Sequence, residues 1–373
     1  MQYTNAWIFT PDRGFVHGGF TVENGRFGEI FIGGRAGGED LGGAYVIPGL
    51  IDAHTHGAMG ADFSDGDAEG LERMAAYLAS NGVTGFAPTS MTLPYETLAA
   101  AFRTARRLAD ERPARCARVA GVHMEGPFFS EKKKGAQNGA YLRLPDFEAF
   151  RTLYEGCGGL VRIVDLAPEL EGAIPFTRKA KELCTVSAAH TDADYEQAKA
   201  VFEAGATHLT HLFNAMPPIH HRKPGPIAAA SEAAGVTAEL ICDGLHVHPA
   251  AVRMAFRLFP GRICLISDSL RCCGMPDGAY ELGGQRVFLS GGVARLADGT
   301  IAGAASNLFD DLRNAVAFGI PREEAILAAT LIPARELGCA DELGSIEPGR
   351  LADFVVCDGE LNRQAVFLGG ERL

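Results

Sequence analysis

The stretch that decides the fold runs from Pro48 to His56 and has the sequence PGLIDAHTH. Its apolar part continues a run that begins at Tyr45. This run predicts a strand over 45–54 that is buried on both faces, as in parallel sheets. The stretch ends in His54 and His56, and residues i and i+2 of an extended chain share a face. Both imidazoles can therefore reach one ion, and their position at a strand end favours metal binding over an isolated, satisfied pair.

Seven further apolar runs follow the first, each bounded by turn or polar residues. They cover residues 82–89, 118–124, 160–167, 185–190, 207–213, 237–242 and 262–267. Helix-like stretches rich in Ala, Leu, Glu and Arg separate most of them, at 68–80, 95–111, 192–204 and 249–258. Repeated strand–helix units of this number predict an α/β fold, a TIM-like (β/α)8 barrel. A Gly-rich, hairpin-like stretch over 280–298 interrupts the pattern after the eighth strand.

Both ends of the chain have a different sequence pattern from the middle. Short apolar or aromatic runs lie at 3–10, 19–23 and 26–32, and the hairpin dipeptide Asn24-Gly25 separates the last two. The C-terminal end of the chain has the same pattern, with apolar runs at 352–357 and 365–368. We expect both ends to form one small β-sandwich domain, 1–47 plus 348–373, beside a barrel domain over 48–347.

Composition excludes several classes of protein. The chain has 373 residues, of which 47% are hydrophobic and 21% charged, a globular balance that excludes disorder and coiled coils. The formal net charge of −12 argues against nucleic acid or an anionic membrane as partner. No apolar run approaches the roughly 18 residues of a membrane helix, and the N-terminus lacks the pattern of a signal peptide. Nine cysteines without a CxxC pair suggest free thiols, so we expect a soluble, cytoplasmic enzyme.

Groups that bind metals or move protons follow most of the predicted strands, at the end where such a barrel holds its active site. Besides the first two histidines, they are Glu125, His190, His211, Asp243, His246 and Asp268. Glu125 follows an apolar strand and precedes Gly-Pro, which favours a ligand over a solvated loop carboxylate. With His190 and His211 it makes a Glu/His/His set that leaves one position open for water, as a hydrolytic metal site requires.

Asp268 follows the eighth predicted strand. It could cap a helix, but a strand end places it better to take a proton from water and return it to a leaving group. His246 could be a ligand, a substrate contact or a second acid–base group, and the sequence leaves these roles open. Two other histidines are expected to be structural: His123 packed beneath Glu125, and His208 on the opposite strand face under a helix.

Together these motifs resemble the N-acetylglucosamine-6-phosphate deacetylase family of the amidohydrolase superfamily. The resemblance is carried by PGLIDAHTHG at 48–57, HMEGPF at 123–128, AHT at 189–191, THLFNAM at 210–216, DGLH at 243–246, SD at 267–268 and GSIEPGRLAD at 344–353. HxEGPF and THLFNAM are specific to this family rather than to the superfamily. The resemblance implies metal-dependent hydrolysis of N-acetylglucosamine 6-phosphate to glucosamine 6-phosphate and acetate, in amino-sugar catabolism.

The resemblance also implies a metal centre and a catalytic residue. Glu125, His190 and His211 match the family's metal ligands, and Asp268 matches its catalytic aspartate. His54 and His56 match a second metal site that only some members retain. One or two divalent ions per subunit are therefore implied, zinc first, with iron, manganese or cobalt as alternatives.

Substrate contacts follow from the same resemblance. They are implied for Ala136, Gln137, Asn214, Ala215, Arg222, His246, Ile301, Ala302 and Gly303. Arg222 matches a phosphate-binding arginine that a neighbouring subunit contributes, which implies a homodimer acting on a phosphorylated N-acetyl amino sugar. Gln137 departs from the pattern, because some members carry histidine there.

Two other interpretations stay open. Another amidohydrolase would act on a different amide, on a cyclic amide or on a nucleobase. Such sites commonly bridge two metals through a carboxylated lysine, where this chain has Glu125, and they would leave Arg222 without a purpose. A metal-free scaffold on the same barrel would have no need for five candidate ligands and Asp268.

Overall fold

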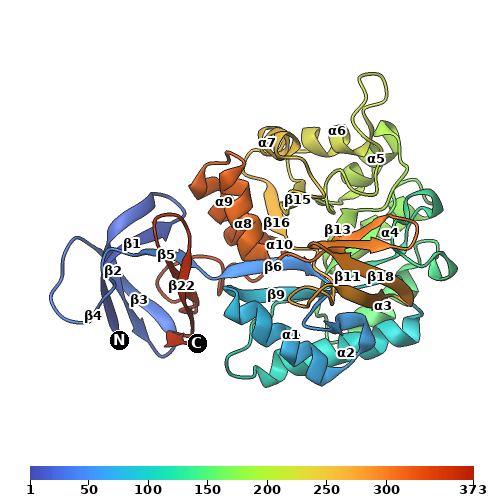
Figure 1. The fold of residues 1–373 in the computed structure, drawn as a ribbon. Coiled ribbons are helices and arrows are strands. Elements are labelled where there is room, and N and C mark those ends of the chain that lie inside the picture. Colours follow the sequence, from blue (N-terminus) through green and yellow to red (C-terminus); the bar gives the residue numbers. More distant parts are fainter.

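The computed structural model describes residues 1–373, and eight parallel strands at its centre form a nearly closed barrel (Figure 1). The strands are β6 (Leu50–Thr55), β9 (Val83–Ser90), β11 (Val122–Phe128), β12 (Val161–Leu166), β13 (Thr185–Ala188), β14 (His208–Leu209), β15 (Thr237–Ile241) and β16 (Ile263–Ile266). The first and last strands meet where the backbone N–H of Asp268 donates to the carbonyl of His54 at 2.9 Å. The predicted barrel is confirmed.

Helices alternate with the strands and cover the outside of the barrel (Figure 1). They are α1 (Ala68–Ser80), α2 (Tyr95–Glu111), α3 (Phe147–Gly156), α4 (Ala173–Ala180), α5 (Tyr195–Ala204), α6 (Gly225–Glu232), α7 (Pro249–Leu258), α8 (Leu308–Ala317), α9 (Arg322–Ala329) and α10 (Leu331–Glu336). In α1 the Asp67 carboxylate caps the first turn, and Leu71, Met74 and Leu78 face the core at helical spacing. None of the helices is long and apolar enough to cross a membrane.

The first predicted strand, over 45–54, is divided between two sheets. Its beginning is β5 (Tyr45–Pro48), which pairs with the terminal strands β1 (Gln2–Thr10) and β21 (Phe354–Cys357). Only the part from Leu50 onward belongs to the barrel. Gly49 lies at the junction, where a Cβ atom would come within 2.1 Å of the Thr84 hydroxyl. The apolar pattern runs through this junction unchanged because both halves are buried.

Strands from both termini form the predicted small β unit, shown at the left of Figure 1. They are β1 (Gln2–Thr10), β2 (Gly14–Glu23), β3 (Arg26–Ile32), β4 (Glu39–Asp40), β5, β21 (Phe354–Cys357), β22 (Arg363–Leu368) and β23 (Glu371–Arg372). The sheet encloses its own aromatic core, in which the rings of Phe354 and Phe367 stack 4.3 Å apart. The exact domain boundaries at 47/48 and 347/348 stay a prediction.

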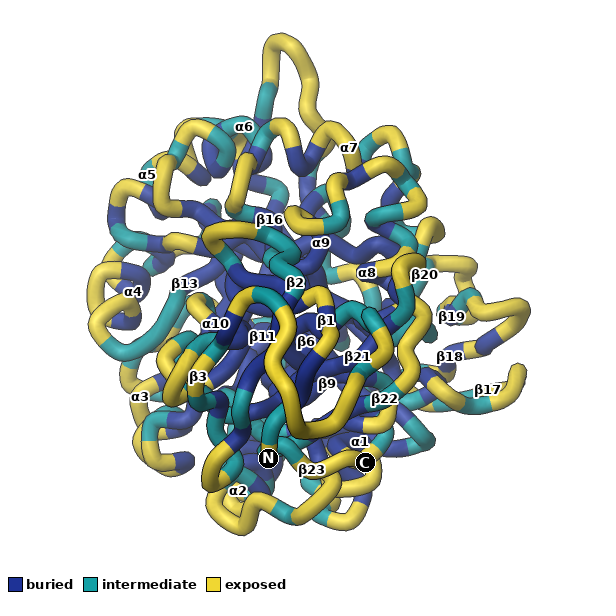
Figure 2. The backbone as a smooth tube through the Cα atoms, turned by 90° about the vertical axis from the view of Figure 1, so that its left-hand side faces the viewer, coloured by how far each residue is buried: buried dark blue, intermediate teal, exposed yellow.

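An antiparallel meander follows the barrel, where the sequence predicts a hairpin-like stretch. It consists of β17 (Gly278–Leu282), β18 (Gln285–Ser290), β19 (Val293–Leu296) and β20 (Ile301–Ala304). Smaller strands are β7 (Gly57–Ala58) with β8 (Ala61–Asp62), and β10 (Arg118–Val119), which pairs with β9. Figure 2 shows the buried centre of the barrel and one exposed loop that projects beside α6.

Candidate metal and active site

Glu125, His190 and His211 meet at the carboxyl end of the barrel. The Nε2 atoms of His190 and His211 lie 3.1 and 3.2 Å from Oε1 of Glu125, and 3.1 Å from each other. All three residues are buried. One carboxylate oxygen and two imidazole nitrogens thus surround one point, which is the donor set of a tetrahedral metal with an open position.

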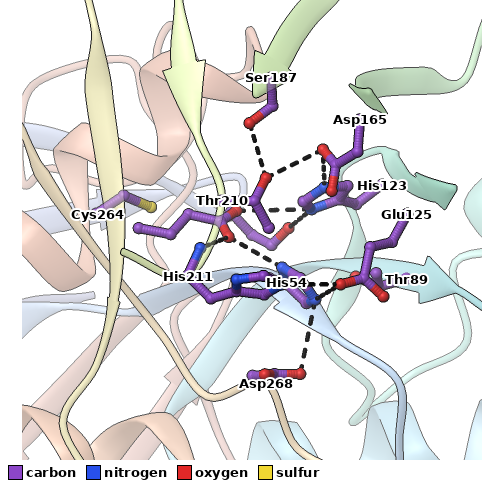
Figure 3. A network of polar contacts seen from close by, with 12 residues as sticks. His54, Thr89, His123, Glu125, Asp165, Ser187, Thr210, His211, Cys264 and Asp268 are labelled. Carbon is purple, nitrogen blue, oxygen red and sulfur yellow. Dashed lines mark hydrogen bonds and ion pairs between the residues drawn. The ribbon is translucent and has the colours of Figure 1, made fainter. Parts of the chain in front are cut away.

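His54, His56 and Asp268 form a second set beside the first. Figure 3 shows His54 of this set, with Glu125 and Asp268 close to its ring. The Nε2 atoms of the two histidines are 3.3 Å apart, and they lie 3.6 and 3.3 Å from Oδ1 of Asp268. Glu125 stands between the two sets, because Oε2 of its carboxylate is 3.5 Å from Nε2 of His56. The six residues that the sequence nominates as ligands or catalyst therefore share one buried cluster.

The hydrogen bonds of the imidazoles fit metal binding. Nδ1 of His190 faces the carbonyl of Lys133 at 2.8 Å, and Nδ1 of His56 faces the carbonyl of Thr89 at 3.1 Å. A carbonyl only accepts, so Nδ1 must carry the proton in both rings. The Nε2 lone pair of His190 then faces Nε2 of His211 and the Glu125 carboxylate, and that of His56 faces Nε2 of His54 and the Asp268 carboxylate. A divalent cation satisfies such a cluster.

Three of these residues adopt a backbone conformation that L side chains rarely take. His190, His211 and Asp268 have φ values of 43°, 31° and 49°. Each comes two residues after its strand ends, at β13, β14 and β16. The left-handed turn redirects the side chain into the barrel mouth, and such strain is typical of functional sites.

The predicted direction of His208 is wrong. The expected strand over 207–213 ends at Leu209, and the left-handed turn at His211 breaks the alternation on which that prediction depends. His208 points into the barrel, where its Nε2 lies 3.1 Å from Oε1 of Glu239. His123, in contrast, is buried beneath Glu125 as predicted, with its Nε2 2.8 Å from Oδ1 of Asp165.

The buried acids of the barrel interior are functional candidates that the sequence motifs did not predict. Glu239 and Asp165 are fully buried, and Glu239 contacts His54, His208 and the backbone N–H of His211. A signal was present, since each acid interrupts an apolar strand, TAELI and VRIVDL. A carboxylate at such a position needs partners, which marks it as part of a polar network.

A cavity of about 200 Å³ opens over the cluster. Its walls include all the predicted substrate contacts except Arg222: Ala136, Gln137, Asn214, Ala215, His246, Ile301, Ala302 and Gly303. The last three belong to β20 of the meander. The backbone N–H of Ala304, the last residue of β20, donates to the carbonyl of Asp268 at 2.9 Å and so joins the meander to the end of β16. A Cβ atom at Gly303 would come within 2.9 Å of Leu270, so only glycine fits there.

Gln137 faces the metal cluster from the cavity wall. Its Nε2 donates to Oε2 of Glu125 at 2.5 Å, and its Oε1 accepts from the backbone N–H of Thr92 at 2.7 Å. Both ends of the amide are therefore held. The side chain orients a carboxylate that the sequence nominates as a metal ligand, in addition to lining the cavity.

His246 reaches the cavity from the loop after β15. Nδ1 of its ring lies 2.6 Å from Oδ2 of Asp243, which also accepts two backbone N–H groups through Oδ1. Burial raises the pKa of Asp243, but the hydrogen bond and charge of His246 outweigh it and lower the pKa overall. The ring is thus fixed by an ionised carboxylate, and Nε2 is the nitrogen left to meet a ligand.

Arg222 lies apart from the cavity. It belongs to the exposed segment 218–223, and its Nη1 contacts Nε2 of His221 at 2.6 Å. It lines a separate surface hollow together with Asp192 and Asp194. No lysine or arginine lines this cavity, so a single chain offers neither an ammonium nor a guanidinium group there for a phosphate.

Asp311 of α8 is a buried acid outside this cluster, and neither of its carboxylate oxygens has a hydrogen-bond partner. Burial, and then the charge of Asp243, raise its pKa well above the usual range. The unfolded carboxyl ionises near pH 4, so stability is lost as the pH rises from there toward the folded-state pKa. We expect Asp311→Asn to remove this loss, so that its stability relative to wild type increases between pH 4.5 and 8.

Thermal unfolding midpoints across this pH range measure the effect. Asp12→Asn removes an exposed carboxylate in the turn between β1 and β2, which is not among the charges that act on Asp311, and is the control for the loss of one surface charge. A difference between Asp311→Asn and wild type that is equally large at both ends of the range would contradict the prediction.

Comparison with known proteins places the chain in a family. Residues 45–372 match the model of the Amidohydrolase family. The N-acetylglucosamine-6-phosphate deacetylase of Bacillus subtilis is 39% identical over 329 residues, which cover 84% of this chain and 81% of that protein. The N-acetylgalactosamine-6-phosphate deacetylase of Escherichia coli is 38% identical, with 87% of each chain covered.

A solved structure gives the same result. The N-acetyl-D-glucosamine-6-phosphate deacetylase of Mycobacterium smegmatis, in complex with N-acetyl-D-glucosamine-6-phosphate, superposes with a TM-score of 0.93. It is 34% identical and covers 100% of this chain and 98% of its own. The chain therefore belongs to the amidohydrolase family, among the N-acetylglucosamine-6-phosphate deacetylases.

Proposed function

We propose that this protein hydrolyses the acetamide bond of N-acetylglucosamine 6-phosphate and releases glucosamine 6-phosphate and acetate. The observation that carries the proposal is the Glu125/His190/His211 cluster beside Asp268, at the floor of a cavity with the predicted sugar contacts on its walls. The names of the Bacillus subtilis and Mycobacterium smegmatis relatives, at 39% and 34% identity, support the same reaction.

Glu125, His190 and His211 would hold the first divalent ion, and His54 and His56 would contribute to a second. Zinc is our first candidate, because imidazole nitrogen and carboxylate oxygen are its usual ligands, with iron, manganese and cobalt as alternatives. When bound, such an ion lowers the pKa of a water toward about 7 and polarises the amide carbonyl.

Asp268 is the proton carrier in this proposal. Burial alone would raise the pKa of its carboxyl, but the charge of His54 and a hydrogen bond from His56 lower it overall. The carboxylate is therefore ionised at neutral pH and able to accept a proton from the attacking water. It then returns this proton to the amine nitrogen as the amide bond breaks.

His246 is the substrate contact nearest the reacting group in this proposal. Asp243 holds its Nδ1, so that Nε2 is available to the acetamide. A donor held in place in a buried site stabilises charge that develops on the carbonyl oxygen. The backbone and side chains of Asn214, Ala215 and the 301–303 segment would hold the sugar.

We propose that the substrate phosphate is bound by Arg222 of a second copy of the chain. A phosphate dianion favours a guanidinium fork, and the cavity has no lysine or arginine of its own. Arg222 lies on the exposed segment 218–223, where it can reach a neighbouring subunit. The active form would then be a homodimer.

Arg222→Ala is expected to lower kcat/KM for the phosphorylated sugar about 10- to 100-fold, since hydrogen bonds to charged groups contribute roughly 1.5–3 kcal/mol. Lys223→Ala, one residue away, is the matched control and should have little effect. Co-expression of Arg222→Ala with Asp268→Asn tests the dimer directly. A mixed dimer rebuilds one complete site from Asp268 of one subunit and Arg222 of the other, so activity should return. If it does not, Arg222 acts within its own chain or not at all.

Acetate release from N-acetylglucosamine 6-phosphate tests the reaction itself. Unphosphorylated N-acetylglucosamine and N-acetylgalactosamine 6-phosphate are the comparison substrates, the latter because of the Escherichia coli relative. We expect turnover that falls steeply without the phosphate. Absence of acetate with every sugar and every added metal would instead favour an amidohydrolase of another amide.

We also propose a cytoplasmic location. All nine cysteines are free, and the adjacent Cys272 and Cys273 are both buried. Free thiols in this number persist where glutathione and thioredoxin keep them reduced.

A further inference from the structure

A row of buried acids and imidazoles runs through the barrel beneath the metal cluster. At its centre is Glu239, which lies in the middle of β15 and has no solvent exposure. Its Oε2 lies 2.9 Å from Nδ1 of His54 and accepts the backbone N–H of His211 at 3.1 Å. Its Oε1 lies 3.1 Å from Nε2 of His208. Both oxygens are therefore engaged, and the carboxylate has one orientation.

The contact with Glu239 distinguishes His54 from the other candidate ligands. Nδ1 of His56 and Nδ1 of His190 face backbone carbonyls, whereas Nδ1 of His54 faces a carboxylate. A carboxylate fixes the proton on Nδ1 and makes Nε2 more basic than a carbonyl does. Nε2 of His54 is the atom that faces His56 and Asp268 at the second metal position.

The row continues from Glu239 to the other end of the barrel. Nδ1 of His208 lies 3.0 Å from Oε2 of Glu336, the last residue of α10, and Oε1 of Glu336 accepts from the Thr237 hydroxyl at 2.7 Å. His208 thus lies between two carboxylates and must donate from both nitrogens. This imidazolium compensates the buried charge of Glu239, without which a carboxylate at this depth would be costly.

Glu239, His54 and His123 also lie close enough together to hold an ion themselves. The contacts of His123 argue against this. Its Nε2 faces Oδ1 of Asp165 at 2.8 Å and its Nδ1 faces the carbonyl of Ala53 at 3.1 Å. Both nitrogens face acceptors, so neither has a lone pair directed at an ion. Glu239 acts on the imidazole of His54 instead.

We propose that Glu239 is a positioning residue that orients His54 and thereby strengthens the binding of a second divalent ion. The proposal rests on the proposed metal-dependent function. The proposal goes beyond that function, because it assigns the affinity for a second ion to a side chain on strand β15 that contacts neither substrate nor metal. The side chains of the first set, Glu125, His190 and His211, make no hydrogen bond to Glu239. Only the backbone N–H of His211 donates to it.

Metal titration of the apoprotein with zinc or cobalt tests the proposal without an activity assay. Wild type is expected to bind two ions per chain. Glu239→Gln keeps the shape but loses the charge, and should weaken the second ion about 10- to 100-fold, the usual effect of losing such a partner. The first ion should bind within a few-fold of wild type. Asp165→Asn, which removes another buried barrel carboxylate that does not contact His54, is the matched control and should bind both ions.

A second variant keeps the test decisive if Glu239→Gln folds poorly. His54→Gln removes the target of Glu239 and should weaken the second ion at least as much. Adding Glu239→Gln to His54→Gln should weaken the second ion little further, because the two residues act through one contact. A wild-type chain that binds one ion only, or a Glu239→Gln chain that binds both as wild type does, overturns the proposal. Failure of the deacetylase assay with all sugars would sink the proposed reaction and leave these metal affinities standing.

Discussion

Asp268→Asn is expected to lower kcat for acetate release at least about 10³-fold, while KM changes little. The carboxylate is the only proton carrier proposed for both halves of the reaction, and general acid–base groups contribute 10²–10⁴-fold. Asparagine has the same shape and still fills the space beside His56, so the cavity and its sugar contacts should be preserved. Initial rates of acetate release over a range of N-acetylglucosamine 6-phosphate concentrations separate kcat from KM.

Metal analysis of the same variant distinguishes a lost proton carrier from a lost ligand. Asp268 lies close enough to His54 and His56 to share an ion with them. If its principal role is proton transfer, the first ion should remain bound at full stoichiometry. The exposed Asp277→Asn is a suitable control. A kcat within ten-fold of wild type would remove Asp268 from the mechanism.

Removal of divalent metal is the second change with a large expected effect. Chelation should reduce turnover to about a thousandth or less, because the pKa of water then returns from near 7 to 15.7. Added zinc, cobalt, manganese or iron should restore it, and the order of the restored rates identifies the effective ion. The structure supports this expectation because three potential ligand atoms lie within 3.2 Å of each other. They are Oε1 of Glu125, Nε2 of His190 and Nε2 of His211.

Glu125→Gln is the variant that should not recover when metal is added. Its amide cannot supply the charge that faces both histidine sets, so the first ion should be lost even at high metal concentration. Full turnover by protein shown to be free of metal would contradict a metal-dependent reaction. It would move the interpretation toward a different chemistry on the same barrel.

The sequence by itself determined the barrel and the order of its strands. Apolar runs of strand length, separated by helix-like stretches, repeat for a local reason: each strand is buried on both faces and each helix on one. The same locality explains the candidate site. Glu125, His190, His211 and Asp268 come at or just after apolar runs, and the carboxyl ends of parallel strands meet at one mouth. The structure brings all four together.

The sequence was less successful where an outcome depends on partners distant in the chain. The run 45–54 has one pattern but joins two sheets, because pairing with β21 or with β9 leaves its hydrophobicity unchanged. The expected strand over 207–213 ends at Leu209, because a left-handed turn at His211 has no signature in hydrophobic alternation. The prediction that His208 lies on the opposite strand face depends on that alternation, and its side chain instead points into the barrel toward Glu239.

Only the tertiary structure decided which polar groups serve the site from outside its motifs. Glu239 and His54 are 185 positions apart, and no local pattern connects them, yet their side chains meet at 2.9 Å. Gln137 lies on a loop, whose path cannot be predicted from hydrophobic periodicity, and its side chain contacts Glu125. Arg222 lines a surface hollow separate from the cavity of its own chain. The physical reason is common to all three. Burial of a segment is recorded in its own residues, whereas the direction and partner of a polar side chain are set by whichever distant element packs against it.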